Sequence, residues 1–334
     1  MGWMYVERRR AQTMSGGCVR MACKMEIHNR RMELKDRACN YCTLILMLLW
    51  VTASGQGQCG YNAGFETGTF TGWSGATGTC STAYCDSVTM TPGLIAGRHT
   101  ITSGSILDWR ACNNITTVCP WGGMYSMQLG NSNVNWETEE ASYSYTVSAS
   151  NPILVYAYAA VLQDPNHPDT AQPTFRSYVK DMNNNIIPCT FYRVNATQLR
   201  TGQLCNWSPP VWYKSWTKVA VDLSAYAGQT VTLYFRTNDC GWGAHYGYAY
   251  VDVIGCYPKR ISLPPCGTRL PYVMSAPDGF ASYQWSTGQT GQQITINNLL
   301  SFISVTVTSY HGCSFTLTAS QTITRPSLSM ISHN

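Results

Sequence analysis

Five segments of this chain repeat one pattern, in which β-branched and aromatic side chains alternate with small or polar ones. They are Ser142–Val147, Ile153–Val161, Thr217–Leu223, Thr230–Phe235 and Tyr248–Ile254, and Gly, Asn, Asp or Pro residues bound each of them. Alternation with a period of two predicts strands, and no stretch shows a sustained 3.6-residue apolar period with helix caps. Many strands without helices between them predict an all-β sandwich or jelly roll.

The strand pattern breaks at residues 256–265, where Tyr-Pro-Lys-Arg and Leu-Pro-Pro interrupt it. Beyond the break, short strand-like runs alternate with glycines and asparagines, which are typical of turns. A chain of 334 residues is long enough for two or three domains. We therefore predict a jelly-roll β-sandwich over residues 59–256 and a small second β-sandwich over residues 262–325.

Residues 1–55 are predicted to be a leader that contains a secretory signal peptide. The apolar run Thr43–Val51 follows basic residues and precedes the small residues 52–55, which is the order of regions in an export signal. The run is short for a membrane span, so stable membrane insertion is not expected, and a buried core segment is the alternative. A start at Met32 would give the signal an ordinary length, and we expect cleavage between about residues 54 and 59.

Cysteine use also indicates an exported protein. Eleven of the 15 cysteines lie beyond the leader, and that density in an exported chain predicts disulfides. We expect Cys266 to pair with Cys313, because both lie at the edges of the second domain and no other cysteine follows Cys256. We also expect Cys59 to pair with Cys256, which would join the first strand of the jelly roll to its last.

The cysteine spacings lack paired C-x-x-C knuckles with histidines, so a zinc site is not predicted. Eleven is an odd number, which leaves one thiol free, mispaired or intermolecular.

The net charge of +5 comes from the leader. Residues 1–55 contain nine of the 22 Lys and Arg and four of the 17 Asp and Glu, which leaves 13 residues of each sign in the rest of the chain. A neutral chain without a basic patch is not expected to bind nucleic acid. Charged residues make up only 12% of the chain, about half the usual fraction, which argues against a cytosolic enzyme and against a disordered tail.

Three stretches of the first domain resemble a known family. Within Asn62–Trp73, the runs Asn-Ala-Gly-Phe-Glu and Phe-Thr-Gly-Trp are similar to the opening strand and turn of carbohydrate-binding jelly rolls. The middle match consists of Gly123–Asn131, Tyr158–His167 and Gln172–Pro173, and the last match is Asp239–Asp252. Together the three stretches resemble a jelly-roll module of large secreted surface proteins from Bacteroidetes-type bacteria.

The second domain resembles the immunoglobulin-like or PKD-like repeats of the same proteins. The similarity rests on Tyr283–Gly288, Ile303–Thr308 and Gly312–Cys313. The resemblance implies adhesion, gliding or polymer capture, often with a C-terminal type IX secretion sorting domain. No room remains after residue 325 for such a domain, so we expect a fragment, a truncated product or a different export route.

The resemblance also implies a structural calcium ion. In similar jelly rolls, an acidic residue of the first strand and one of the last lie side by side, and here these residues are Glu66 and Asp252. Calcium takes six to eight hard oxygen ligands, so backbone carbonyls would complete the site. The alternative is that both carboxylates cap turns or accept backbone hydrogen bonds.

Two loops carry the polar candidates for ligand contact. Asp164, His167 and Gln172 lie in a Pro-rich loop, and Asp239 and His245 lie in a Gly-rich loop. We expect one ligand-facing edge, although loop histidines more often bond to backbone and fix loop shape. No nucleophile-elbow motif accompanies the histidines, and no spacing singles out two facing carboxylates. The chain is therefore not expected to be an enzyme.

Tryptophan is abundant, with 11 residues. Exposed Trp and Tyr rings can stack on the apolar faces of sugars, whereas core packing must account for most of the tryptophans. Trp212 and Trp242 lie beside turn signals, so these are the two that we expect to be exposed and to bind a ligand.

These features predict a secreted or cell-surface adhesion module that binds a glycan or a cell-surface polymer through loops and aromatic side chains on a rigid sandwich. The alternatives are an accessory domain fragment of a larger secreted hydrolase and a structural spacer of a surface fibre. Fold alone does not decide among the three. Two or more exposed coplanar aromatic rings on one face would favour sugar binding.

Overall fold

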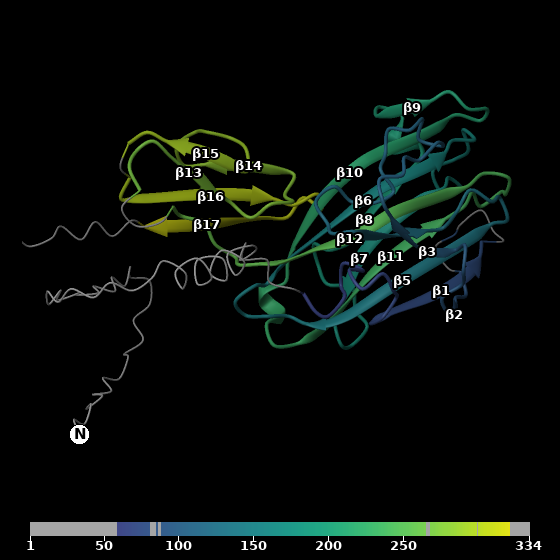
Figure 1. Ribbon diagram of the computed structural model, residues 1–334, viewed down its shortest axis with the longest axis horizontal. Helices are drawn as coiled ribbons and strands as arrows, with labels where there is room; N and C mark the ends of the chain where they lie inside the picture. The colour runs from purple at the N-terminus through teal and green to yellow at the C-terminus, as the bar shows by residue number, and fades with distance from the viewer. Residues whose placement is uncertain (1–58, 81–84, 86–87, 265–267, 299, 321–334) are drawn as a thin grey trace, which may run out of the picture.

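The computed structural model describes residues 59–320, apart from residues 81–84, 86–87, 265–267 and 299 (Figure 1). The predicted leader and Cys266 lie outside the described residues.

The first part of the described chain forms two six-stranded sheets, one with the order β2-β1-β5-β11-β7-β8 and the other with the order β3-β4-β12-β6-β10-β9. All the neighbouring strand pairs are antiparallel. The strands are β1 Trp73–Thr79, β2 Thr91–Pro92, β3 His99–Ser103, β4 Tyr125–Leu129, β5 Glu137–Thr146, β6 Ile153–Gln163, β7 Thr174–Lys180, β8 Tyr192–Asn195, β9 Gln203–Cys205, β10 Val211–Asp222, β11 Thr230–Asn238 and β12 Gly247–Tyr257.

The two sheets pack face to face over one apolar core, to which strands of both sheets contribute. The alternation on β5 follows from this packing, since Ala141, Tyr143 and Tyr145 are buried while Ser144 and Thr146 are exposed. A large apolar side chain buried in this way stabilises the fold by about 1.5–3 kcal/mol. The core therefore sets the register of each strand, because a slip of one residue would turn the apolar set toward solvent.

Strand β6 is buried along its entire length, on both faces. Tyr156 and Tyr158 face the core between the sheets, whereas Val155 and Val161 belong to clusters on the outer face. The chain between β3 and β4, residues 104–124, covers part of that outer face. An apolar run without alternation is what a strand covered on both sides requires.

A buried carboxylate anchors this covering segment. The Asp108 carboxylate accepts hydrogen bonds from the hydroxyls of Tyr248 (2.7 Å) and Tyr250 (3.0 Å) on the outer face of β12. The Cys112–Cys205 disulfide joins the same segment to β9.

The second sandwich consists of a two-stranded and a three-stranded sheet with Trp285 buried between them. It packs on the large sandwich, where the backbone N–H of Ala220 donates to the carbonyl oxygen of Gly279 (2.7 Å). Only glycine fits at position 279, because its φ is +91° and a Cβ there would lie 2.9 Å from the Ala220 nitrogen. The strands are β13 Tyr272–Ser275, β14 Ser282–Trp285, β15 Gln293–Ile296, β16 Phe302–Thr308 and β17 Ser314–Ser320.

The structure confirms the predicted fold class, an all-β chain with a large sandwich followed by a small one (Figure 1). Short 3-10 turns such as Thr197–Leu199 occur, but the described residues include no helix long and apolar enough to cross a membrane.

Two disulfides bear on the predicted pairings. Cys59 is bonded to Cys256, the expected partner, with 5.0 Å between the Cα atoms. Cys313 is bonded to Cys189, with 5.9 Å between the Cα atoms, so the predicted pairing of Cys266 with Cys313 is wrong. The physical reason is that the β7–β8 connection of the large sandwich meets the β16–β17 turn of the small one. The bond therefore links the two sandwiches instead of closing the second.

The Cys59–Cys256 disulfide is expected to contribute more stability than the Cys80–Cys85 disulfide. The first closes a separation of 197 residues and the second a separation of 5, for which the chain-entropy model gives a difference of about 3 kcal/mol. Urea unfolding of the two double Cys→Ser variants measures this difference, and non-reducing peptide mapping verifies the remaining bonds. Equal losses of unfolding free energy would contradict it.

Candidate functional site

One end of the large sandwich gathers the loops that carry most of the predicted ligand residues. The β6–β7 loop, residues 164–173, and the β11–β12 loop, residues 239–246, leave this end together because β6 pairs with β12 and β7 pairs with β11. The backbone N–H of Gly241 donates to the carbonyl oxygen of Ala171 (2.9 Å), which ties the two loops together.

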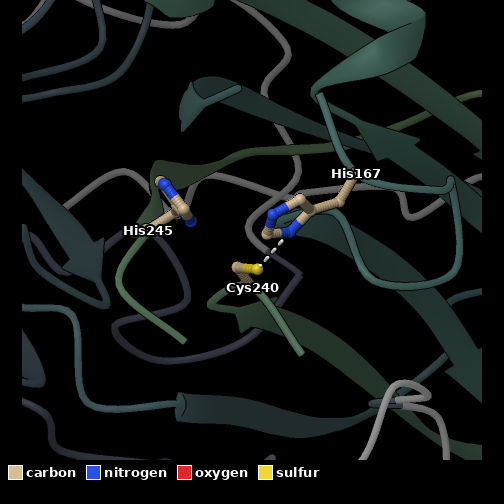
Figure 2. Close-up of side chains that lie close together, drawn as sticks. All are labelled: His167, Cys240 and His245. Atoms are coloured by element: carbon tan, nitrogen blue, oxygen red, sulfur yellow. Dashed lines mark hydrogen bonds between the residues drawn. The ribbon is translucent and has the colours of Figure 1, made fainter. Parts of the chain in front are cut away.

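Two histidines and a free cysteine form a cluster where these loops meet. Figure 2 shows His167 on the first loop pointing toward Cys240 on the second, with His245 beside them. The Nδ1 atom of His167 lies 3.0 Å from the Sγ atom of Cys240, and the backbone N–H of Trp242 donates to the same sulfur (3.3 Å). The sulfur and one ring nitrogen from each histidine all lie within 4.8 Å of one another.

The cluster is uncharged at neutral pH. Burial lowers the pKa of both His167 and His245, and the neighbouring His167 lowers that of His245 further. Burial also raises the pKa of the Cys240 thiol. A catalytic cysteine needs the opposite shift, because the thiolate is the nucleophile. The contact between Cys240 and His167 therefore lacks the electrostatics of an activated nucleophile.

A buried carboxylate holds the His167 loop. Asp164 accepts two hydrogen bonds from the Arg200 guanidinium (2.6 and 2.9 Å), one from the backbone N–H of Asn166 (2.8 Å) and one from the Gln172 amide (2.9 Å). Burial by itself would raise the pKa of Asp164, but these donors outweigh it and lower the pKa to about 2.

Gln172 belongs to this support and not to a ligand-facing surface. Its amide also donates to the carbonyl oxygen of His167 (3.1 Å), and only 1% of its surface is exposed. The predicted ligand contact of Gln172 is therefore wrong, because the side chain is buried and its Nε2 group donates inside the loop.

Asp239 has the same role in the second loop. Its carboxylate accepts hydrogen bonds from the backbone N–H groups of Glu137 (2.8 Å) and Gly247 (3.1 Å). With 2% of its surface exposed, it does not reach a ligand, and that prediction is also wrong. Burial and the charge of the nearby Glu139 raise the pKa of Asp239 to about 8.

Trp242 is exposed and Trp212 is not. The ring of Trp242, 54% exposed, lies 4.5 Å from the His167 ring between centroids. Gly243, with a φ of +82°, carries the loop across Trp136, whose ring would lie 2.5 Å from a Cβ at position 243. Trp212 is half-buried in β10 and packs against the main core, so it lacks the exposure expected of it and its contact with a ligand stays a prediction.

Two further tryptophans extend this surface. The rings of Trp109 and Trp207 lie 5.4 Å apart at an angle of 87°. The Arg110 guanidinium lies 3.9 Å from the Trp109 ring and 5.2 Å from the Tyr246 ring. Trp207 lies in the β9–β10 connection, where the carbonyl oxygen of Pro210 accepts a hydrogen bond from the backbone N–H of Asp164 (2.8 Å), so the pair lies at the same end of the sandwich as the histidine cluster. We call the exposed tryptophans at this end the aromatic edge: Trp109, Trp136, Trp207 and Trp242.

The structure thus brings together His167, Trp242 and His245, three of the predicted ligand residues. Cys240 was not predicted as a site residue, although it shares a short loop with His245 and belongs to a set with an odd number of cysteines. Trp109 and Trp207 were not predicted either, because they are far apart in the chain and meet only where the Cys112–Cys205 disulfide joins their segments.

Glu66 and Asp252 also come together, at another place in the large sandwich. Asp252 is fully buried, and its Oδ2 atom accepts a hydrogen bond from the Ser126 hydroxyl (2.9 Å). Its Oδ1 atom is buried and has no hydrogen-bond partner in the structure. Burial raises the pKa of Asp252 well above its usual range, and the negative charge of Glu66 adds to the shift.

A pair of glycines lets the two carboxylates converge. A Cβ at Gly122 would lie 2.1 Å from the Asp252 Oδ2 atom, and one at Gly123 would lie 1.9 Å from the Glu66 Oε2 atom. The backbone N–H of Met124 donates to the same Glu66 oxygen (2.9 Å). The two successive glycines therefore leave room for both acidic groups, of which Asp252 is buried and Glu66 is exposed.

No protein-family profile matches the sequence, and no curated protein matches it. Among solved structures, TmCBM61 in complex with β-1,4-galactotriose aligns at 10% identity over 60% of this chain and 96% of that chain, with a TM-score of 0.32. A non-crystalline cellulose specific carbohydrate-binding module, CBM28, aligns at 13% identity over 61% of this chain and 97% of that chain, with a TM-score of 0.32. The enzymatically active domain of bacteriophage CBA120 tailspike protein 4 aligns at 10% identity over 60% of this chain and 21% of that chain, with a TM-score of 0.31. Likenesses with such low scores support no inference about function.

Folding stability is expected to fall by about 1 kcal/mol between about pH 7 and pH 9 through Asp239. Because folding raises its pKa to about 8, the folded protein keeps a proton that the unfolded chain has already released, and this advantage is lost as pH rises through that value. Urea unfolding across this range tests it. Asp239→Asn should remove the loss, whereas Asp164→Asn, at a carboxyl whose pKa is about 2, should keep it. An unchanged slope in Asp239→Asn would contradict the assignment.

Proposed function

We propose that this chain is an extracellular, non-catalytic module that binds a glycan or another cell-surface polymer through the aromatic edge. The observation that carries the proposal is the exposure of four tryptophans at one end of the sandwich. Trp109 is 53% exposed, Trp136 43%, Trp207 40% and Trp242 54%. Large apolar rings gathered on a surface are typical of binding sites.

The edge offers the two kinds of contact that sugars use. Indole faces stack on the apolar faces of pyranose rings, and nearby polar groups bond to hydroxyls. Trp109 and Trp207 are perpendicular, so they form a corner and not the coplanar platform set out as a criterion above. Arg110 and His167 lie beside the rings and supply polar groups for orientation.

A structural spacer is the weaker alternative, because a spacer gains nothing from exposing four indole rings. An accessory domain of a secreted hydrolase would use the same surface, so it differs only in its partner. The four disulfides of the described chain are the bonds of an oxidising compartment, which supports secretion.

We also propose a structural calcium ion between Glu66 and Asp252. A buried carboxylate with an unpartnered oxygen, Asp252, and the exposed carboxylate of Glu66 beside it fit a hard cation that prefers oxygen ligands. A proton on Asp252 is the alternative, since it would neutralise the same buried group. The ion would hold the start of the large sandwich to β12, away from the aromatic edge.

On a glycan array, the purified chain is expected to bind at least one polysaccharide class with a dissociation constant in the micromolar range or weaker, about 6–8 kcal/mol. Calorimetry should show that Trp109→Ala and Trp242→Ala each weaken binding about tenfold or more, because each removes a stacking surface worth at least about 1.4 kcal/mol.

The matched control is Trp121→Ala. Trp121 is 43% exposed and packs against Lys218, but it does not belong to the aromatic edge, so its loss should leave affinity unchanged. A lack of binding to all plant, microbial and host glycans on the array would overturn the proposal in favour of a spacer. Turnover of a bound glycan that disappears in His167→Ala or His245→Ala would overturn the non-catalytic assignment.

The melting temperature is expected to rise with added calcium and to fall with chelator, because a ligand that binds only the folded state stabilises it by mass action. Glu66→Gln and Asp252→Asn should each remove this calcium dependence. Differential scanning calorimetry measures both effects.

Asp108→Asn is the matched control, because Asp108 is also a buried carboxyl group but does not belong to the proposed calcium site. It should lower the melting temperature by weakening the bonds to Tyr248 and Tyr250, while the response to calcium remains. A wild-type melting temperature that changes with neither calcium nor chelator would overturn the calcium proposal and leave Asp252 as a protonated hydrogen-bonding group.

A further inference from the structure

We propose that His167, Cys240 and His245 form a binding site for a transition-metal ion of the zinc class. The proposal does not rest on glycan binding, since it concerns only the side chains at the junction of the two loops (Figure 2). Two imidazoles and one thiolate are ligands that zinc prefers, and three protein ligands leave a fourth position open to water or to another ligand.

The distances are close to those of a loaded site. With metal–nitrogen bonds near 2.0–2.1 Å and a metal–sulfur bond near 2.3 Å, the ligand atoms of a tetrahedral site lie about 3.3–3.6 Å apart. Here the His167–Cys240 pair lies at 3.0 Å, and all three atoms lie within 4.8 Å of one another. Side-chain movements of about 1 Å would bring the three ligand atoms to tetrahedral spacing.

The backbone positions Cys240 and His245 toward each other. The Cys240 N–H donates to the His245 carbonyl oxygen (2.9 Å), and the Gly243 N–H donates to the Cys240 carbonyl oxygen (3.0 Å). Gly243 and Ala244 both have positive φ values, +82° and +65°, which close the loop tightly. The two ligands on this loop therefore need little reorganisation to bind one ion, which favours affinity.

A ring nitrogen without a hydrogen-bond partner and a thiol outside any disulfide point to a missing ligand. The Nδ1 atom of His245 is buried and makes no hydrogen bond in the structure, a state that costs free energy unless something binds there. Cys240 is fully buried and free, whereas four disulfides take up eight of the ten described cysteines. Cys119 is the other free thiol among the described residues.

The surroundings suit a divalent cation. Each imidazole can offer the lone pair of a ring nitrogen to an ion. The Trp242 N–H directed at the sulfur would stabilise a thiolate. Binding replaces the thiol proton with the metal ion and releases that proton to solvent.

Cobalt(II) is the probe, because a thiolate ligand gives it a near-ultraviolet charge-transfer band and tetrahedral geometry gives it strong visible bands. The full chain, stripped of metal by a chelator without reductant, is titrated with cobalt and then with zinc. We expect one cobalt ion per chain with both features, release of about one proton per ion, and displacement of cobalt by zinc.

Variants assign the bands to the cluster. Cys240→Ser should abolish the charge-transfer band, and His167→Ala and His245→Ala should each weaken zinc binding by at least about 100-fold. Cys119→Ser and His311→Ala are the matched controls, because they alter the other free thiol and a half-buried histidine outside the cluster. Both controls should bind cobalt like the wild type.

The wild-type titration makes the test independent of whether the variants fold. A cobalt spectrum without the charge-transfer band would overturn the proposal, since octahedral oxygen ligation at Glu66 and Asp252 gives no such band. A band that persists in Cys240→Ser, or peptide mapping that finds Cys240 in a disulfide, would also overturn it. Stronger binding of copper than of zinc would support the same ligand set, provided that the cobalt charge-transfer band is lost in Cys240→Ser.

Discussion

The burial of β6 on both of its faces is the constraint on which the rest of the structure depends. One face completes the core between the two sheets, and the other must be covered because it carries apolar side chains such as Val155 and Val161. Residues 104–124 cover one part and the second sandwich covers another. The position of the small sandwich and the path of the long β3–β4 segment therefore both follow from a strand without a solvated face.

Three buried carboxyl groups hold the loops at this end of the large sandwich in fixed positions. Asp108 anchors the covering segment to β12, Asp164 anchors the β6–β7 loop, and Asp239 anchors the β11–β12 loop. Each accepts hydrogen bonds from donors of the packed chain, as a buried carboxyl group requires. The loops at this end are thus held by polar networks on a rigid scaffold, which is the arrangement that positions binding side chains accurately.

The aromatic edge and the histidine–cysteine cluster share one loop. Trp242 is exposed while its backbone N–H is directed at the Cys240 sulfur, so the same turn presents a ring outward and a ligand set inward. An ion in the cluster would reduce the conformational freedom of this turn. A preorganised ring loses less entropy when it binds a partner, so the two proposed roles are physically compatible.

The sequence by itself determined the fold class, because the period-two alternation of its strands and the absence of helical periodicity allow little else. It also indicated the pairing of Cys59 with Cys256 and the two loops that carry His167 and His245, and its resemblance to a known family implied that Glu66 lies beside Asp252. Cys59 and Glu66 precede β1, whereas Asp252 and Cys256 lie in β12, and the two loops meet because antiparallel pairing brings them to one end.

Tertiary structure alone decided which of these side chains can act. Gln172 and Asp239 are polar residues in loops, yet their hydrogen bonds are internal, and burial is a property of the packed chain that local sequence does not carry. The bond between Cys189 and Cys313 depends on how two sandwiches dock. The meeting of Trp109 with Trp207, and of His167 with Cys240, likewise joins residues that are far apart in the chain and come together only once the sheets have packed.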